Sequence, residues 1–343
     1  MSTVLRLLSF LVASLCMGIF SCQKAEIKRG PDVSGVQVAL VLNRFEQAVF
    51  TLDTNRLPEE MARLQAVYPE LFPLFTQTLI HDVSNPTETP EQAMRAFLRS
   101  PLAKAVYDTV QVVYSNFSDL ESPIKSILQH YRYYFPTKPV PQVATLVTEF
   151  AVDAFTYGDS LCGIGLDMFL GPDYPYYNPE VYPEYLRRQF TKTFIPVRLA
   201  RVMAQNRNDA PSGKRLLDIM VHNGKTLYIA SCLSPETPDS LLMGYTRTQW
   251  EGCSANEPQV WARLLDLNLL YETDYAKFRK LVEPSPNAPM LFTEAPGEIG
   301  NWMGLQIVRA YMLRHPDISM DQLIAMQDAQ QLLEASRYKP KRQ

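Results

Sequence analysis

The chain has 343 residues, of which 46% are hydrophobic, so it can bury a sizeable core as one large domain or two small ones. Its 33 Lys and Arg residues are slightly outnumbered by 36 Asp and Glu residues, which gives a formal net charge of -3. This charge, without a Lys/Arg cluster, excludes the electrostatic footprint that nucleic-acid-binding proteins carry.

The first 21 residues have the pattern of a lipoprotein signal peptide. Arg6 is followed by an uncharged apolar run that ends at residue 21 and is too short to cross a bilayer as a helix. Residues 19–22 (Ile, Phe, Ser, Cys) resemble a bacterial lipobox, which predicts that Cys22 is lipidated and becomes the mature amino terminus. Ordinary secretory cleavage with an incidental cysteine is the alternative. In the lipoprotein interpretation, residues 22–36 tether the protein to a membrane of the cell envelope.

Residues 37–343 are predicted to form a single globular domain. Residues 37–136 are expected to be helical, because apolar side chains recur at helical spacing between punctuating prolines. Residues 143–150 and 161–169 then have strand-like composition around a turn at 157–160, with a third short strand expected at 151–156. Residues 137–335 are therefore expected to contain the sheet and the helices that pack on it. The predicted fold class is therefore α+β, predominantly helical, with a small sheet near residues 140–170 packed among helices.

A loop rich in tyrosine and proline follows at residues 171–185. The side chains of Tyr174, Tyr176 and Tyr177 could stack on a sugar ring or a peptide. In the alternative interpretation, the rings pack onto the loop's own domain and leave their hydroxyl groups in water.

The stretch from residue 213 to residue 270 is predicted to form buried helices joined by a polar loop. Apolar residues recur there at three- and four-residue spacing, whereas Asp218, His222 and Lys225 share another face of the first helix. Asp218 could orient His222 as a general base. A surface ion pair is the simpler interpretation of that spacing.

Cysteine usage leaves two readings of this region open. Once Cys22 is lipidated, Cys162, Cys232 and Cys253 remain in the mature chain. An exported compartment permits a disulfide, and Cys232 with Cys253 is a possible pair. Three buried free thiols fit the sequence equally well. With only three cysteines, a zinc site built from four of them is excluded.

Capping patterns predict where several helices begin. A polar residue followed three positions later by Gln or Glu is typical of a helix start, and this pattern occurs at Ser118, Thr246, Asn256 and Ser319. Residues 296–314 are also expected to be helical. Gly300 and Gly304 in that helix would let another element approach closely.

Common catalytic and cofactor motifs are absent. The four histidines, His81, His130, His222 and His315, include no pair four residues apart, so the sequence has no HExxH. GxSxG, GxxxxGK[ST] and GxGxxG are absent as well. We therefore expect no cofactor, no metal and no catalytic residue.

The chain resembles the gliding-motility lipoprotein family GldB of Bacteroidetes. The resemblance rests on these stretches, in the family's order: the lipobox Cys22, GLDMFLG at 165–171 with the tyrosine-rich loop, LLDIM at 216–220, Gly224 and Lys225, GYT at 244–246, Trp250, Cys253, Asn256 and Glu257, Trp261, and PGEIGNWMGLQIV at 296–308. It implies a membrane-anchored envelope protein associated with gliding motility and with the type IX secretion machinery.

The order of elements also looks like that of predicted zincin peptidases, which carry HExxH on one helix and a ligand Glu-Gly on the next. Here the first of these helices is IPVRLARVMAQNR at 195–207, with arginines and no histidine, and Asn223 precedes Gly224. The resemblance thus implies a zincin-like scaffold that lacks its metal ligands.

These observations predict a protein that acts by contact with envelope protein partners rather than by catalysis. Its candidate interaction residues are Tyr174, Tyr176, Tyr177, Asp218, His222, Asn223 and Lys225, which would flank the empty cleft of a zincin. The alternatives are a divergent peptidase or hydrolase that uses Asp218, His222 or Glu257, and a lipoprotein that binds cell-wall glycan through its tyrosines.

Overall fold

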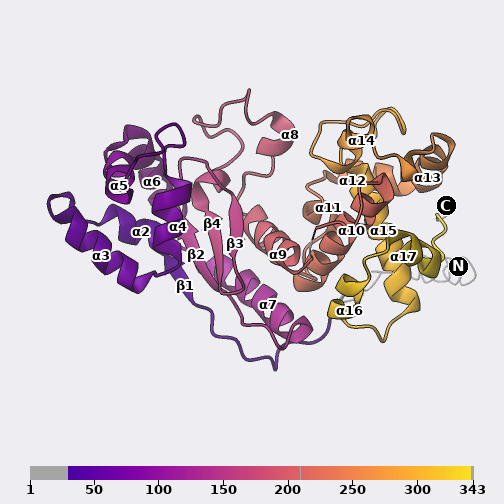
Figure 1. Ribbon diagram of the computed structural model, residues 1–343, viewed down its shortest axis with the longest axis horizontal. Helices are drawn as coiled ribbons and strands as arrows, with labels where there is room; N and C mark the ends of the chain where they lie inside the picture. Colours follow the sequence, from indigo (N-terminus) through magenta and orange to yellow (C-terminus); the bar gives the residue numbers. More distant parts are fainter. Residues whose placement is uncertain (1–29, 209, 341–343) are drawn as a thin grey trace, which may run out of the picture.

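A computed structural model describes residues 30–208 and 210–340 (Figure 1). The predicted signal peptide and the lipidation site Cys22 lie outside the described residues. Within those two ranges, no helix is long and apolar enough to cross a membrane.

The described residues form one four-stranded sheet, with the strands in the order β1-β2-β4-β3. The strands are β1 (Leu42–Arg44), β2 (Gln142–Leu146), β3 (Ala154–Tyr157) and β4 (Leu161–Gly165). β1, β2 and β4 are parallel, whereas β3 runs antiparallel to β4. The three predicted strands are present as β2, β3 and β4, but the strands expected at 143–150 and 161–169 each end four residues earlier, at Leu146 and Gly165. The helical prediction for residues 37–136 is wrong at β1, because this strand is defined by its partner β2, about a hundred residues further along the chain.

Helices from the first part of the chain cover one side of the sheet, where Figure 1 shows them in indigo and purple. Helix α7 (Ser118–Tyr134), drawn in magenta, lies instead beside α9 (Phe194–Arg207) and also contacts α10 (Leu216–Leu233). The helices on the first side are α2 (Phe45–Phe50), η1 (Thr54–Arg56), α3 (Leu57–Val67), α4 (Leu71–Leu74), η2 (Phe75–Leu79), α5 (Pro90–Arg99) and α6 (Pro101–Val113). Their core is aromatic, and Phe75 meets both Phe45 and Phe97 edge to face. Ser118 is the first residue of α7 rather than its cap, since Phe117 occupies the N-cap position.

In the second part of the described chain, after β4, the regular elements are all helices, joined by several long loops. Its elements are η3 (Leu166–Phe169), α8 (Glu184–Arg187), α9 (Phe194–Arg207), α10 (Leu216–Leu233), α11 (Asp239–Leu242), α12 (Arg247–Ala255), α13 (Glu257–Asp266), η4 (Leu269–Tyr271), α14 (Tyr275–Val282), α15 (Ile299–Arg314), α16 (Met320–Ala325) and α17 (Ala329–Ser336). The predicted capping boxes at Thr246 and Ser319 are present, whereas Asn256 makes no side-chain cap for α13. Helix α9 contacts β3, β4, α7 and α10, and so joins the sheet to the second set of helices. The α+β, predominantly helical fold class is confirmed.

The possible disulfide between Cys232 and Cys253 is not formed. All three cysteines of the described chain are buried free thiols. Cys232 lies near the hydroxyl groups of Tyr134 and Tyr228, whereas Cys253 lies near Tyr245. Because the two thiols face different neighbours, they are not positioned as a bonded pair. Burial raises the pKa of Cys232 to about 11 and that of Cys253 to about 12.

The closest packing between helices occurs where α10 crosses α15. A Cβ atom added at Gly304 would lie 1.8 Å from the carbonyl oxygen of Met220, and one added at Gly224 would lie 2.3 Å from the carbonyl carbon of Gly304. At this crossing each helix contacts the other through its backbone. The predicted close approach at Gly304 is therefore confirmed.

We predict that Gly304→Ala lowers the free energy of unfolding by about 3 kcal/mol or more, because the clashing Met220 atoms belong to the backbone and have no rotamer by which to withdraw. Gly252→Ala in α12 is the matched control. A Cβ there meets nothing within 4 Å, so alanine should stabilise the helix by about 0.5–1 kcal/mol. Urea unfolding of both variants measures the difference. Similar stability of the two variants would contradict this account of the crossing.

A strained loop after β2 surrounds a fully buried carboxyl group. Glu149 and Phe150 have positive φ angles of 52° and 71°, a region that non-glycine residues seldom adopt. Asp167 Oδ2 accepts hydrogen bonds from the backbone N–H groups of Thr148 (3.0 Å) and Phe150 (2.7 Å), and so holds the loop. Burial raises the pKa of Asp167 to about 6, although these two hydrogen bonds oppose the shift.

This raised pKa predicts a pH-dependent stability. In the folded protein Asp167 binds its proton more tightly than in the unfolded chain, so its contribution is complete below about pH 4 and is lost as the pH rises through about 6. The loss amounts to about 3 kcal/mol. Asp167→Asn should remove this part of the pH dependence, whereas Asp266→Asn, an exposed control on α13, should leave it intact. Denaturant unfolding between about pH 4 and 7 tests both variants, and an unchanged profile for Asp167→Asn would refute the assignment.

Candidate functional site

A polar cleft lies where α9 meets the turn before α12 and the segment that leads into α15. We call it the arginine cleft. In Figure 1 these elements converge from the middle and the upper right of the molecule. The cavity has a volume of about 60 Å³ and is lined by Tyr185, Leu186, Arg188, Gln189, Arg198, Arg201, Met243, Gly244, Tyr245, Gln249, Pro284, Ser285, Pro296, Gly297 and Glu298.

Arg188 is held in the cleft by neutral acceptors. Its Nη2 donates to the carbonyl oxygen of Gly244 at 2.7 Å and to Gln249 Oε1 at 3.0 Å. Gln249 is itself fixed, because the same oxygen accepts from the backbone N–H of Thr246 in the capping box of α12. Gly244 has a φ of 68°, and a Cβ there would lie 2.7 Å from the amide of Gln189, so the turn that presents its carbonyl oxygen requires glycine.

Arg198 and Arg201 project from α9, one helical turn apart. The Nε of Arg198 lies 3.1 Å from Asp153 Oδ2, and its Nη2 donates to Gln189 Oε1 at 3.1 Å. Burial lowers the pKa of Arg198, although Asp153 opposes the shift. Arg201 is half-buried and makes neither a hydrogen bond nor a salt bridge within the described part of the chain. Its guanidinium group therefore has all its donors available.

Glu298 supplies a carboxyl group to the same cleft. It caps α15 in the left-handed conformation, with a φ of 61°. Asn301 Nδ2 donates to its Oε1 at 3.2 Å. Burial raises the pKa of Glu298, and the positive charge of Arg201 opposes that shift. The segment before Glu298 is held by the hydroxyl group of Tyr245, which donates to the carbonyl oxygen of Gly297 at 2.6 Å.

The chemistry of the cleft is that of anion recognition. Guanidinium groups stay protonated at any physiological pH and present planar sets of N–H donors that match carboxylates and phosphates. They are poor general acids or bases near neutral pH for the same reason. A site with three of them is therefore suited to hold an anionic group.

The polar residues predicted on α10 serve mainly the fold. Asp218 forms a two-pronged ion pair with Arg215, from Nη2 to Oδ1 at 2.6 Å and from Nε to Oδ2 at 3.0 Å, and is buried rather than on the surface. Lys225 is buried and donates to the carbonyl oxygens of Ile324 (3.4 Å) and Met326, at the end of α16. Burial lowers the pKa of Lys225 to about 8.

The remaining two predicted residues of α10, His222 and Asn223, contact different parts of the structure. The side-chain amide of Asn208 lies 3.2 Å from His222 Nδ1, so the histidine faces the end of α9. Asn223 Nδ2 instead donates to Asn301 Oδ1 at 2.8 Å. Because Asn301 also donates to Glu298, Asn223 is connected to the arginine cleft through one intervening side chain. Among the four predicted residues of α10, Asn223 is the one that we connect to the arginine cleft through hydrogen bonds of the described chain.

The tyrosine-rich loop packs onto its own domain. Tyr177 is buried; its hydroxyl group donates to the carbonyl oxygen of Asp167 at 2.7 Å and accepts from the N–H of Leu170 at 3.0 Å. The hydroxyl group of Tyr174 lies 3.4 Å from Thr109 Oγ1 of α6. Tyr176 is 49% exposed. The tyrosines and the polar residues of α10 therefore serve different parts of the fold.

The residues of the alternative hydrolase also have separate structural partners. Asp218 binds Arg215, His222 faces Asn208, and Glu257 accepts a hydrogen bond of 2.6 Å from the hydroxyl group of Tyr338. Among the residues that the structure describes, no three His, Cys, Asp or Glu side chains are grouped so that they could hold a metal ion.

The sequence contained a signal for the arginine cleft that the motif search did not use. Arg198 and Arg201 stand three positions apart in a helix whose other positions are mostly apolar, and charged residues are rarely buried without a specific partner or role. We noted these arginines only because they replaced the histidines of a zinc motif. Arg188 and Glu298 join them through tertiary structure alone.

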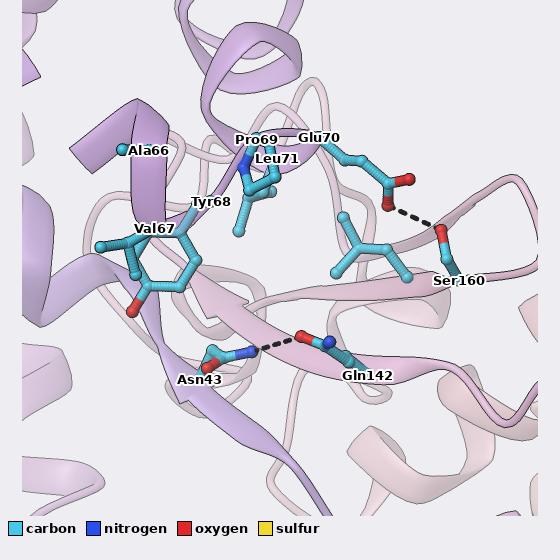
Figure 2. A pocket seen from close by; sticks show the side chains of 10 residues that line it. Asn43, Ala66, Val67, Tyr68, Pro69, Glu70, Leu71, Gln142 and Ser160 are labelled. Atoms are coloured by element: carbon cyan, nitrogen blue, oxygen red, sulfur yellow. Dashed lines mark hydrogen bonds between the residues drawn. The ribbon is translucent and has the colours of Figure 1, made fainter. Parts of the chain in front are cut away.

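A second, larger hollow lies at the starting ends of β2 and β4 (Figure 2). We call it the strand-end pocket. It has a volume of about 470 Å³ and is lined by Asn43, Ala66, Val67, Tyr68, Pro69, Glu70, Leu71, Gln142, Ser160 and Leu161. Figure 2 shows two hydrogen-bonded pairs at its sides: Ser160 Oγ donates to Glu70 at 2.6 Å, and Asn43 donates to Gln142 at 3.2 Å.

Comparison with known proteins identifies a family for this chain. A search of curated proteins and a search of solved structures each found no match, so the zincin-like arrangement stays a prediction. Residues 26–340 match the model of one family, described as gliding motility protein GldB and designated a lipoprotein family. That match covers nearly the whole chain and implies association with the cell envelope and the gliding motility machinery. The chain therefore belongs to the GldB family of gliding motility lipoproteins.

Proposed function

We propose that this protein is lipid-anchored through Cys22 and supports gliding motility and type IX secretion by non-catalytic contact with an envelope protein. The arginine cleft is the contact site in this proposal. The periplasmic or surface face of the membrane, to which the tether of residues 22–36 would hold the domain, gives the cleft access to such partners.

The observation that carries the proposal is the half-buried Arg201, which lies beside Arg198 and Glu298 without a hydrogen bond or salt bridge in the described chain. Glu298 attracts Arg201 without a hydrogen bond to it. A half-buried guanidinium group whose donors have no hydrogen-bonded anion is unfavourable, so such a group is typical of a site that an outside ligand completes. The neighbouring Arg188 is already oriented by Gly244 and Gln249, so little side-chain entropy would be lost on binding.

The proposal predicts that charge in the cleft is needed for motility. The double variant Arg188→Gln and Arg201→Gln should abolish or severely reduce colony spreading when it replaces the wild-type gene in a gliding strain. The wild-type protein should form a cross-link with its partner protein in cells, and this double variant should not, because charged groups at an interface control how fast and how tightly two proteins associate. Spreading assays and cross-linking in cells measure both effects.

Arg247→Gln is the matched control for this experiment. Arg247 lies on α12, its side chain is 91% exposed, and its ion pair is with Glu251 in the same helix. This variant should glide and capture its partner as the wild type does. If the cleft variant is present at normal levels and still glides normally, the cleft is not the contact site.

A second candidate function is binding of cell-wall glycan in the strand-end pocket. Its volume of about 470 Å³ lies in the range of small-ligand sites. Amide, hydroxyl and carboxylate groups from Asn43, Gln142, Ser160 and Glu70 offer the donors and acceptors that sugar hydroxyls require, and Leu71 and Leu161 offer an apolar surface. This observation moves the glycan hypothesis away from Tyr177, whose ring is buried.

Glycan binding predicts that the protein is retained on isolated cell wall and that Glu70→Gln together with Gln142→Ala reduces this retention about tenfold or more, since polar groups of the pocket would lose their hydrogen bonds to sugar. Glu60→Gln on α3 is the control, because Glu60 pairs with Arg63 on the same helix. A sedimentation assay with purified wall material measures retention. Equal retention of the pocket variant and the control would remove this candidate.

A further inference from the structure

We infer that the arginine cleft binds a single carboxylate group, presented by a peptide segment of the partner. This inference rests on the proposed function, since it names the chemical group that the same site recognises. The cavity volume of about 60 Å³ gives room for one small anionic group and a few water molecules. A whole aromatic or sugar ring would not fit, so the group must enter from a ligand that lies mostly outside the cleft.

The balance of charges around the cleft favours one negative charge. Arg188 is hydrogen-bonded to two neutral acceptors, and Arg198 is paired with Asp153. Arg201 has Glu298 as its neighbouring carboxyl group. Arg188 is near the carboxyl group of Glu184, but Glu184 is exposed and water screens its charge, so Arg188 is the least neutralised of the three guanidinium groups.

A carboxylate matches this incompletely neutralised charge better than a phosphate group does. A carboxylate carries one negative charge, whereas a phosphate monoester carries about −1.5 to −2 at neutral pH. The additional charge of a phosphate would lie beside Glu298, which lines the cleft, where repulsion between like charges is costly in a partly desolvated site. A carboxylate also fits the planar fork of an arginine in a two-pronged arrangement.

The hydrogen-bond donors that would hold the carboxylate are already in place. Both hydrogen bonds that Arg188 makes within the described residues come from Nη2, so Nη1 and Nε are left for a ligand. Arg201 contributes its whole fork. Arg198 is fixed between Asp153 and Gln189 and supplies positive charge rather than a free fork.

Glu298 acts as an internal competitor in this arrangement. Its carboxyl group lines the cleft and attracts Arg201 in the absence of a ligand. Removing its charge while keeping its shape should therefore strengthen ligand binding. A residue with a purely structural role would have the opposite effect or none, so the sign of this change separates recognition from loss of folding.

The test is titration of the full-length protein, purified in mild detergent, with sodium acetate at constant ionic strength, chloride being the replaced anion. Calorimetry and the change in Tm both measure binding. Wild type should bind acetate and gain thermal stability, because a ligand that binds only the folded state stabilises it. Arg201→Gln should lower the affinity about tenfold or more, Glu298→Gln should raise it severalfold, and Arg247→Gln should leave it unchanged.

Peptides then identify the source of the carboxylate. A short peptide with a free carboxyl terminus and no acidic side chain is compared with its amidated form and with an amidated form that contains one Glu. Binding of either carboxylate-bearing peptide, with loss in Arg201→Gln, supports the inference. Binding of the amidated neutral peptide with equal affinity would overturn it.

Two further results would also overturn the inference: acetate has no more effect than chloride, or inorganic phosphate binds more tightly than acetate. The outcomes differ from a failure of the proposed function. If acetate binds as expected and the cleft variant still glides, the carboxylate site is real but is not the motility contact. If the variant stops gliding and acetate does not bind, the contact uses other chemistry.

Discussion

The backbone contact between α10 and α15 is the constraint on which the second half of the molecule depends. Because Gly224 and Gly304 lack side chains, the two helices approach until the carbonyl oxygen of Met220 meets α15 directly. This approach sets the position of α15 along its whole length, including its first turn. Glu298, the N-cap of that helix, is therefore placed in the arginine cleft by packing in the core together with the hydrogen bond from Tyr245 to Gly297.

The cleft combines rigid and unsatisfied groups in a way that favours recognition. Arg188 and Arg198 are oriented by neutral or singly charged neighbours, and the turn at Gly244 and the capping box at Thr246 hold those neighbours in turn. Because the arginine side chains are already oriented, less side-chain entropy is lost on binding. Because their positive charge is only partly neutralised, they still attract an anion. A surface arginine such as Arg247 has the same charge but a weaker attraction for an anion, because water screens it and its ion pair with Glu251 neutralises it.

Local signals in the sequence predicted local structure well. The capping boxes at Thr246 and Ser319 and the turn before β4 depend on residues three or four positions apart, and all three are present. β1 was missed because its strand conformation comes from pairing with β2, across a long stretch of chain. The polar face of α10 was recognised, but its coverage by the segment after α16, which accepts from Lys225, is a tertiary contact that periodicity cannot show. The arginine cleft was missed for the same reason, since its charges come from three separate segments: the end of α8, α9 and the residue before α15.

Asn223 shows how the core and the cleft are joined. It precedes Gly224, so it lies on α10 at the crossing with α15, and its amide donates to Asn301. Asn301 in turn donates to Glu298 and to the carbonyl oxygen of Val282, so its amide group has a fixed direction. A carboxylate in place of Asn223 would face the acceptor oxygen of Asn301 and add negative charge beside Glu298, which would offset the positive charge of Arg201. An uncharged donor at this position therefore adds no second carboxylate to the hydrogen-bond chain that leads to Glu298, and so is compatible with the carboxylate site that we propose.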